Sequence, residues 1–182
     1  EVVNGDQLIA LFALQLKAHN ALANNAVAVT VMTNMGFHIA MKNAGIDVLV
    51  TPVGDRSILL ALQEAQACLG GEQSGHVVLS EFATTGDGVL TALHLMSEMK
   101  STGKSMKELA AIVNRLPQVL INVANVDKGS ISKSAVLDAV SKLNQELGDT
   151  GRILLRPSGT EPLIRVMVEA ATAEQANAVA KE

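Results

Sequence analysis

The sequence predicts an α/β domain with a mixed, largely parallel sheet between helices, followed by a smaller α+β domain. Through residues 1–115, buried strand-like runs alternate with helical patterns, which is typical of a parallel sheet with crossover helices. Through residues 116–182, two strand-like runs follow each other around a short turn, which indicates an antiparallel hairpin. The chain has 182 residues, of which 48% are hydrophobic, so each domain can bury a core of its own.

The first domain opens with a helix expected at residues 7–19, because its leucines recur at helical spacing. Asp6 precedes this helix and Asp55 begins a later one, so both acids are expected to cap helices. The other elements expected in this domain are a buried strand at 25–32, a helix at 36–45, a buried strand at 46–52, a helix at 55–67, a short strand at 77–81, a helix at 88–103 opened by Thr85 or Asp87, and a helix at 105–116.

The second domain begins near Pro117, which stands between a helical pattern and a new strand-like run. Its expected elements are a strand at 118–125, a helix at 133–147, strands at 152–156 and 162–170, and a helix at 172–182. The last pattern is still helical at the final residue, and the first residues read as the end of a strand. We therefore expect the chain to be a piece of a longer protein.

Composition disfavours several classes of function. The formal net charge of −4, from 14 basic and 18 acidic residues, disfavours a nucleic acid or a membrane as the partner. Aromatic residues make up 2% of the chain, so stacking platforms for bases are not expected. Cys68 is the single cysteine, which rules out an internal disulfide, and its apolar context favours a packed thiol over a nucleophile. A reducing, cytoplasmic location is expected.

The segment RPSGTEP, residues 156–162, joins the two adjacent strand-like runs of the second domain. Five residues in or beside it supply donors that a phosphate accepts: Arg156, Ser158, Gly159, Thr160 and Arg165. The arginines offer planar forks, the hydroxyls offer single donors, and the glycine lets backbone N–H groups approach an anion. The alternative is an ordinary polar hairpin turn with solvated arginines. Under either interpretation Glu161 is placed to pair with Arg165.

The segment GGEQSGH, residues 70–76, is the second candidate. Glu72, Ser74 and His76 alternate, so an extended backbone would present an acid, a hydroxyl and an imidazole on one side. Those groups suit the vicinal hydroxyls of a sugar, and His76 can also carry a proton near neutral pH. The alternative is a turn with Glu72 as a surface acid. A metal site is disfavoured, because Glu72 and His76 supply two ligands at an unusual spacing.

These two loops, in this order and with TTGDG between them, resemble the C-terminal half of an α-D-phosphohexomutase, closest to the phosphoglucosamine mutase branch. VNGDQLIALFA, TVMTNMGF, TPVGDR and RPSGTEPLIRVMVEA extend the resemblance over essentially the whole chain. Members of the family have four domains. The resemblance implies that residues 1–115 are the third domain and residues 116–182 the fourth, which has a fold of the TATA-box-binding-protein-like type.

The resemblance also implies roles for the two loops. Glu72 and Ser74 are expected to contact sugar hydroxyls, and His76 to act as a catalytic residue beside the transferring phosphoryl group. The arginine, serine, glycine and threonine of residues 156–160, with Arg165, are expected to bind the non-reacting phosphate. The two loops are thereby expected to contact different parts of one phosphosugar substrate.

The family reaction interconverts glucosamine 6-phosphate and glucosamine 1-phosphate, with a phosphoserine and an Mg²⁺ held by an Asp-rich loop in the upstream domains. Neither motif occurs in these residues, so we expect no metal ligand here and no mutase activity from this chain alone. The expected partners are a phosphosugar and the N-terminal domains of the same protein, and a homodimer is left open. Two alternatives remain: a fragment of a phosphomannomutase/phosphoglucomutase, and a phosphosugar-binding module without catalysis.

Overall fold

The computed structural model describes residues 2–182. The chain separates into two compact units, one ending at Arg115 and the other beginning at Leu116. Over the described residues, no helix combines the length and the apolar character that a membrane crossing requires.

The first unit is built on a four-stranded sheet. Its strands are β1 Ala26–Thr30, β2 Asp47–Thr51, β3 Leu69–Gly71 and β4 Val77–Leu79. Its helices are α1 Gly5–Ala18, α2 Met35–Asn43, α3 Asp55–Ala65, α4 Gly88–Thr102 and α5 Met106–Ala110, with a 3₁₀ turn at Ala23–Asn25. The strand order is β2-β1-β3-β4, in which β1 is parallel to both neighbours and β4 is antiparallel to β3. The predicted mixed, largely parallel sheet is confirmed.

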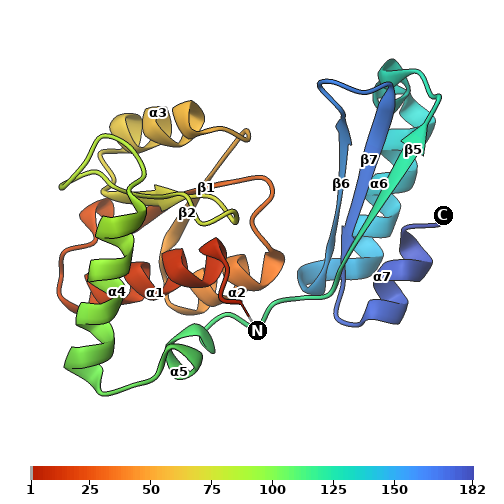
Figure 1. Ribbon diagram of the computed structural model, residues 1–182. Coiled ribbons are helices and arrows are strands. Elements are labelled where there is room, and N and C mark those ends of the chain that lie inside the picture. The colour runs from red at the N-terminus through yellow and green to blue at the C-terminus, as the bar shows by residue number, and fades with distance from the viewer. Residues whose placement is uncertain (1) are drawn as a thin grey trace. The chain divides into compact units, whose positions relative to one another are not determined.

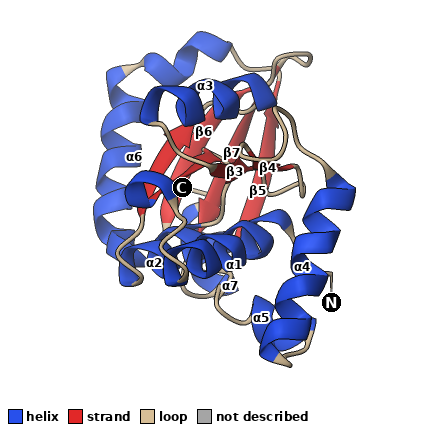
Figure 2. Ribbon diagram, turned by 90° about the vertical axis from the view of Figure 1, so that its left-hand side faces the viewer, coloured by secondary structure: helices blue, strands red, loops and turns tan. Residues whose placement is uncertain are grey.

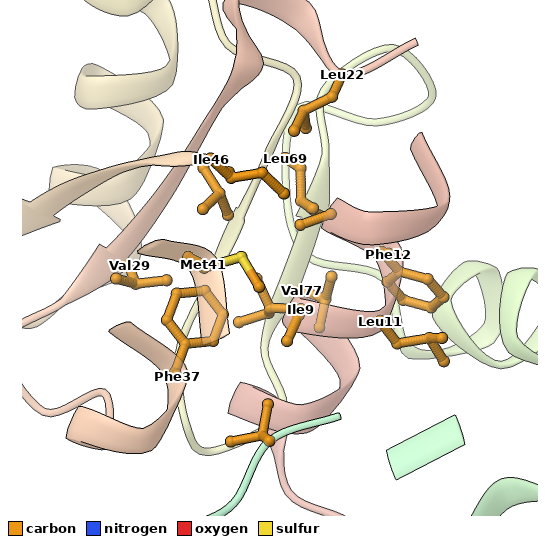
Figure 3. Packing of buried hydrophobic residues seen from close by; sticks show 14 of the residues in the cluster. Ile9, Leu11, Phe12, Leu22, Val29, Phe37, Met41, Ile46, Leu69 and Val77 are labelled. Atoms are coloured by element: carbon orange, nitrogen blue, oxygen red, sulfur yellow. The ribbon is translucent and has the colours of Figure 1, made fainter. Parts of the chain in front are cut away.

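Helices cover both faces of this sheet, with α1 and α2 on one side and α3 on the other (Figure 1, Figure 2). In β1, Val27 and Val29 join the apolar cluster shared with α1 and α2, which Figure 3 shows from close by. Ala26 and Ala28 join the smaller cluster shared with α3. A strand buried on both faces needs an apolar residue at every position, which explains the unbroken AVAV run.

The expectation of a second buried strand at 46–52 is wrong in part. β2 lies at the edge of the sheet and pairs with β1 alone. Both Asp47 and Val50 are exposed, and Val50 keeps 51% of its accessible surface. The apolar run alone does not reveal this, because the strand order decides which apolar strand has neighbours on both sides.

Two helices in the first unit begin differently from the prediction. Asn4 caps α1, because its side chain accepts from Gln7 N–H at 3.1 Å while the Gln7 side chain accepts from Asn4 N–H at 3.2 Å. Asp6 is therefore not the cap, and it lies buried inside the first turn of the helix. α3 begins after Gly54 without a side-chain cap, so the capping role expected of Asp55 is also wrong.

The last two helices of this unit carry side-chain caps. Asp87 caps α4 by accepting from two backbone N–H groups, which confirms one of the two predicted caps. Ser105 and Glu108 form a capping box at α5, and the hydrogen bonds from Ser105 lower the pKa of the Glu108 carboxyl. α5 ends at Ala110, which is earlier than the expected helix at 105–116.

Cys68 is the packed thiol that the sequence predicts. It is buried, and its Sγ accepts a hydrogen bond from Ala23 N–H at 3.4 Å. The thiol S–H in turn donates to the Ala21 carbonyl oxygen at 3.6 Å. The thiol thus ties the segment before β1 to the start of β3 and serves the packing of the unit.

The second unit is a three-stranded antiparallel sheet with two helices, as predicted. Its strands are β5 Gln118–Ala124, β6 Arg152–Pro157 and β7 Leu163–Glu169, in the order β5-β7-β6. Its helices are α6 Ser134–Leu147 and α7 Ala173–Val179, with 3₁₀ turns η2 Lys128–Ser132 and η3 Gly148–Thr150. Leu147 of α6, Ala176 of α7 and Val168 of β7 meet in its apolar cluster, which Val166 and Ile153 extend along the same face of the sheet.

Candidate functional site

The loop at residues 72–76 connects β3 to β4 as a tight hairpin turn. Glu72 N–H donates to the His76 carbonyl at 2.9 Å, and Gly75 N–H donates to the Glu72 carbonyl at 3.0 Å. Gly75 has a φ of +98°, which is readily adopted only by glycine. The extended backbone considered for this segment is therefore wrong, and alternation along the chain does not place its three polar side chains on one side.

The start of α1 braces this loop. Gly5 N–H donates to the Gln73 carbonyl at 2.9 Å, and the Gln73 amide donates to Asp6 Oδ2 at 3.1 Å. The same Asp6 oxygen accepts from Asn34 N–H at 2.9 Å, and Asp6 is 1% exposed. A Cβ on Gly5 would overlap the Glu72 carbonyl, so the loop lies directly against the helix backbone. A buried carboxylate thus joins the loop to the beginnings of two helices.

Glu72 and Ser74 both keep polar atoms available to a ligand. Glu72 Oε1 accepts from Gly54 N–H at 3.0 Å, just before α3, and its second carboxylate oxygen has no hydrogen bond within residues 2–182. Ser74 is exposed, and in the same described range its hydroxyl is not hydrogen bonded. One oxygen of Glu72 therefore fixes the loop while the other stays open.

His76 has two possible partners for one nitrogen. Its Nε2 lies 3.2 Å from Gly86 N, which donates to it, and 3.4 Å from Asp55 Oδ2. These contacts are alternatives: Nε2 accepts from Gly86 N–H when it carries no proton, and it pairs with Asp55 when it carries one. Gly86 packs against the imidazole so closely that a Cβ there would overlap the ring. The site therefore offers a partner to each protonation state of His76.

A depression of about 290 Å³ lies beside this loop. Its lining residues are Thr30, Met32, Val53, Glu72, Gln73 and Ser74. They stand at or beyond the carboxyl ends of parallel strands, where open α/β sheets bind their ligands. His76 lies outside this set. Across residues 2–182, no cluster of three or more His, Cys, Asp or Glu side chains could hold a metal ion.

The second loop joins β6 to β7, and its backbone is closed by hydrogen bonds within the turn. Ser158 N–H donates to the Leu163 carbonyl at 2.9 Å, and Ser158 Oγ accepts from Glu161 N–H at 3.2 Å. Ser158 is buried, with 4% exposure, whereas Gly159 and Thr160 are exposed at the tip. Of the predicted donors in the turn, the serine therefore shapes the loop, and the glycine and threonine face solvent.

Two arginines stand directly opposite each other beside this turn. The strand register pairs Arg156 of β6 with Arg165 of β7, so their side chains share a face of the sheet. Arg165 Nη2 binds Glu161 Oε2 at 3.3 Å, which confirms the predicted pair. Arg165 Nε is buried without an acceptor, and the Arg156 guanidinium has no hydrogen bond or ion pair with any of residues 2–182. Paired like charges are destabilising, so this arrangement calls for a further anion.

Sequence reasoning missed several contacts of these loops. Lys128 of η2 donates from Nζ to the Ser158 carbonyl, across a separation of 30 residues that no local pattern reveals. The sequence places Gly86 and Asp55 near helix starts, yet both contact His76. The pattern Asn4-x-x-Gln7 is a readable capping box and could have identified the true cap of α1.

Comparison with models of known protein families shows to which family the chain belongs. The family model described as phosphoglucomutase/phosphomannomutase, alpha/beta/alpha domain III, matches residues 4–116, and the C-terminal domain of the same family matches residues 120–182. The chain belongs to the phosphoglucomutase/phosphomannomutase family. This result confirms the resemblance inferred from the two loops.

Curated relatives in this family include phosphoglucosamine mutases. The enzyme of Thermobifida fusca is 53% identical over 180 residues, which is 98% of this chain and 40% of that protein. The enzyme of Nocardioides sp. is 55% identical over 179 residues, with the same coverage of 98% and 40%. The chain thus spans about two-fifths of the length of these relatives.

Solved structures of the family share the fold. N-acetylphosphoglucosamine mutase of Aspergillus fumigatus, in complex with GlcNAc-6P and magnesium, superposes with a TM-score of 0.83 at 21% identity. The match covers 100% of this chain and 46% of that one. A family protein from Burkholderia thailandensis has a TM-score of 0.74 at 18% identity, covering 100% of this chain and 40% of that chain.

Proposed function

We propose that this chain is the substrate-binding half of a phosphoglucosamine mutase, an intramolecular phosphotransferase that interconverts glucosamine 6-phosphate and glucosamine 1-phosphate. The observation that carries the proposal is the arginine pair of the second loop. Arg156 has no counter-charge within residues 2–182, and the buried Nε of Arg165 has no acceptor. A phosphate dianion supplies both the charge and the acceptor oxygens that these groups lack. The identity of 53–55% with phosphoglucosamine mutases supports the choice of substrate.

The second loop holds the non-reacting phosphate in this proposal. Arg156 and Arg165 each present a planar fork to phosphate oxygens, with N–H donors that match their geometry. The exposed Gly159 and Thr160 add a backbone N–H and a hydroxyl from the tip of the turn. Ser158, which is buried, keeps its hydroxyl proton available to a ligand while its oxygen accepts from the backbone. Their joint action clamps the phosphate and leaves the rest of the sugar exposed for reaction.

The first loop binds the sugar hydroxyls in this proposal. The open carboxylate oxygen of Glu72 accepts from hydroxyl groups, and the Ser74 hydroxyl donates or accepts beside it. His76 serves at the reacting oxygen, because it can hold a proton on Nε2 against Asp55 and release it with Gly86 N–H as the new partner.

The metal and the phosphoserine of the family belong to other parts of the parent protein in this proposal. Among residues 2–182 the His, Cys, Asp and Glu side chains form no cluster that fits a metal ion, so we assign the Mg²⁺ ligands to the upstream domains. The chain alone is accordingly expected to bind substrate without converting it. The cytoplasmic location inferred from composition stays a prediction.

Titration of the ¹⁵N-labelled chain with glucosamine 6-phosphate tests the binding step. Amide shifts are expected in residues 72–76 and 156–160. Glucosamine without the phosphate is the control ligand and is expected to leave the second loop unshifted. An absence of shifts in both loops at millimolar ligand contradicts the proposal.

Complementation separates the enzyme from the alternative of a non-catalytic binding module. The N-terminal half of the parent protein is added to the chain in trans, and the conversion of glucosamine 6-phosphate is measured. Activity that requires both halves supports the mutase. Parallel assays with mannose and glucose phosphates test the alternative of a phosphomannomutase/phosphoglucomutase, which predicts a preference for those sugars.

A further inference from the structure

Lys128 is held in place by the turn from which it projects. It is the first residue of η2, and Asp127 caps that turn by accepting from Gly129 N–H at 3.0 Å. The Asp127 carbonyl also accepts from the Ser130 hydroxyl at 2.6 Å and from Ser130 N–H at 3.0 Å. A turn fixed by three hydrogen bonds limits where the half-buried lysine side chain can reach.

The ammonium of Lys128 binds a carbonyl of the second loop instead of a carboxylate. Nζ donates to the Ser158 carbonyl oxygen, and it has no ion pair with any acid among residues 2–182. Its charge therefore adds to those of Arg156 and Arg165, and within the described part of the chain Glu161 is the one carboxylate that opposes them in an ion pair. An excess of positive charge at a single hairpin turn favours an anionic ligand.

The bond from Lys128 also fixes the direction of the next peptide group. In a trans peptide the carbonyl of one residue and the N–H of the following residue point in opposite directions. Because the Ser158 carbonyl points to Lys128, the Gly159 N–H points away from it. The position of a Gly159 Cβ has no atom within 4 Å, so this part of the loop borders open space.

The other hydrogen bonds of the loop, including the one from Glu161 N–H to Ser158 Oγ, do not involve the Ser158–Gly159 peptide. Ser158 N–H donates to the Leu163 carbonyl at 2.9 Å, and Asn125 N–H donates to the Pro162 carbonyl at 3.2 Å. Neither contact involves the Ser158 carbonyl or the Gly159 N–H. Among the hydrogen bonds of residues 2–182, the one from Lys128 Nζ is the one that the Ser158 carbonyl accepts.

We propose that Lys128 is a positioning residue of the phosphate-binding loop: it orients the Ser158–Gly159 peptide so that the Gly159 N–H donates to the phosphate, and it adds a third positive charge beside Arg156 and Arg165. The inference rests on the proposed function, since it assigns a role within that same site. It also predicts a property of the chain without ligand, namely a defined orientation of the Gly159 amide.

The test compares variants of the ¹⁵N-labelled chain, with glucosamine 6-phosphate as the probe. Lys128→Met removes the donor and the charge but keeps an aliphatic side chain, and about tenfold weaker binding is expected. Lys133→Met removes a lysine that follows the same turn and lacks a contact with the loop, so its dissociation constant should stay within about twofold of the wild type. Lys128→Arg keeps a cationic donor and should recover part of the affinity.

A second measurement needs no ligand. In Lys128→Met, the Gly159 amide resonance is expected to move and its hydrogen exchange to accelerate, whereas Lys133→Met leaves both unchanged. Should Lys128→Met unfold the chain, Lys128→Gln takes its place with the same expected loss. If the bond from Lys128 only stabilised the fold, the Lys128 variants would have a lower Tm but would bind glucosamine 6-phosphate as tightly as the wild type, and the inference would be overturned.

The outcomes separate the inference from the proposed function. If the wild-type chain fails to bind glucosamine 6-phosphate, the proposed function fails and the inference fails with it. If the wild type binds and the Lys128 variants bind equally well with an unmoved Gly159 resonance, the inference alone is overturned. Weaker binding together with a displaced Gly159 amide supports both.

Discussion

Replacing Gly159 with alanine should separate stability from binding. A Cβ at this position meets no atom within 4 Å, and Gly159 is not among the glycines with positive φ. The alanine therefore fits the ligand-free backbone without a clash. By restricting the unfolded chain, such a substitution raises the free energy of unfolding by about 0.4–1 kcal/mol, or about 2–8 °C in Tm for a domain of this size.

The same methyl group is expected to weaken phosphate binding. It occupies the open space beside the Gly159 N–H, where a phosphate oxygen has to approach. Loss of one hydrogen bond to a charged group costs about 1.5–3 kcal/mol, which corresponds to a dissociation constant about 10- to 140-fold higher. Thermal unfolding and calorimetric titration with glucosamine 6-phosphate measure the two effects on one preparation.

Gly88→Ala is the matched control, because Gly88 is the first residue of α4 and a Cβ there would also meet no atom within 4 Å. It should raise stability by a similar amount and leave the dissociation constant unchanged. If Gly159→Ala gains stability yet binds the ligand within twofold of the wild type, no phosphate approaches this peptide and the proposed clamp is wrong.

Three further substitutions test other parts of the two loops. Arg156→Ala in the full-length enzyme should raise KM and lower kcat/KM about 30- to 700-fold, which corresponds to a loss of about 2–4 kcal/mol of transition-state stabilisation. A change in kcat/KM under about twofold contradicts the clamp. Gly86→Ala in the full-length enzyme should displace the His76 ring, which its Cβ would overlap, and lower kcat about 100-fold while circular dichroism shows an unchanged fold; full activity argues against His76 at the reacting oxygen. Asp6→Ala should lower the free energy of unfolding by about 1–3 kcal/mol in urea denaturation, because it leaves the buried Asn34 N–H without its acceptor; an unchanged midpoint refutes that role.

The order of helices and strands was predictable because the spacing of hydrophobic residues and the local composition can be read from short stretches of sequence. The unbroken apolar run of β1 and the hairpin of β6 and β7 both carry their signature within short stretches of chain. The partners of individual acids were less accessible. Asp6 and Asp55 each occupy a first helical turn, where capping is the common role, but tertiary contacts direct Asp6 to Gln73 and Asp55 to His76.

The candidate loops were predicted by their residue types, whereas their geometry was not. The expectation for residues 72–76 assumed an extended backbone, but the structure has a turn there, with a positive φ at Gly75. The opposition of Arg156 and Arg165 depends on strand register, which the sequence of a short hairpin fixes only through its turn. Lys128 lies 30 residues from its partner, and a lysine in a polar segment has no feature that distinguishes it from a solvated one.

A common division of roles connects the two loops. In each loop, the groups that set the backbone are bonded to the protein: Gln73 is bonded to Asp6, and the Ser158 carbonyl to Lys128. Three groups assigned to the ligand have no hydrogen bond within residues 2–182: the Arg156 guanidinium, the second carboxylate oxygen of Glu72 and the Ser74 hydroxyl. Loops shaped before binding avoid the ordering cost of about 0.5–1.5 kcal/mol for each side chain that the ligand would otherwise immobilise. The bracing contacts therefore favour binding loops over simple connections between strands.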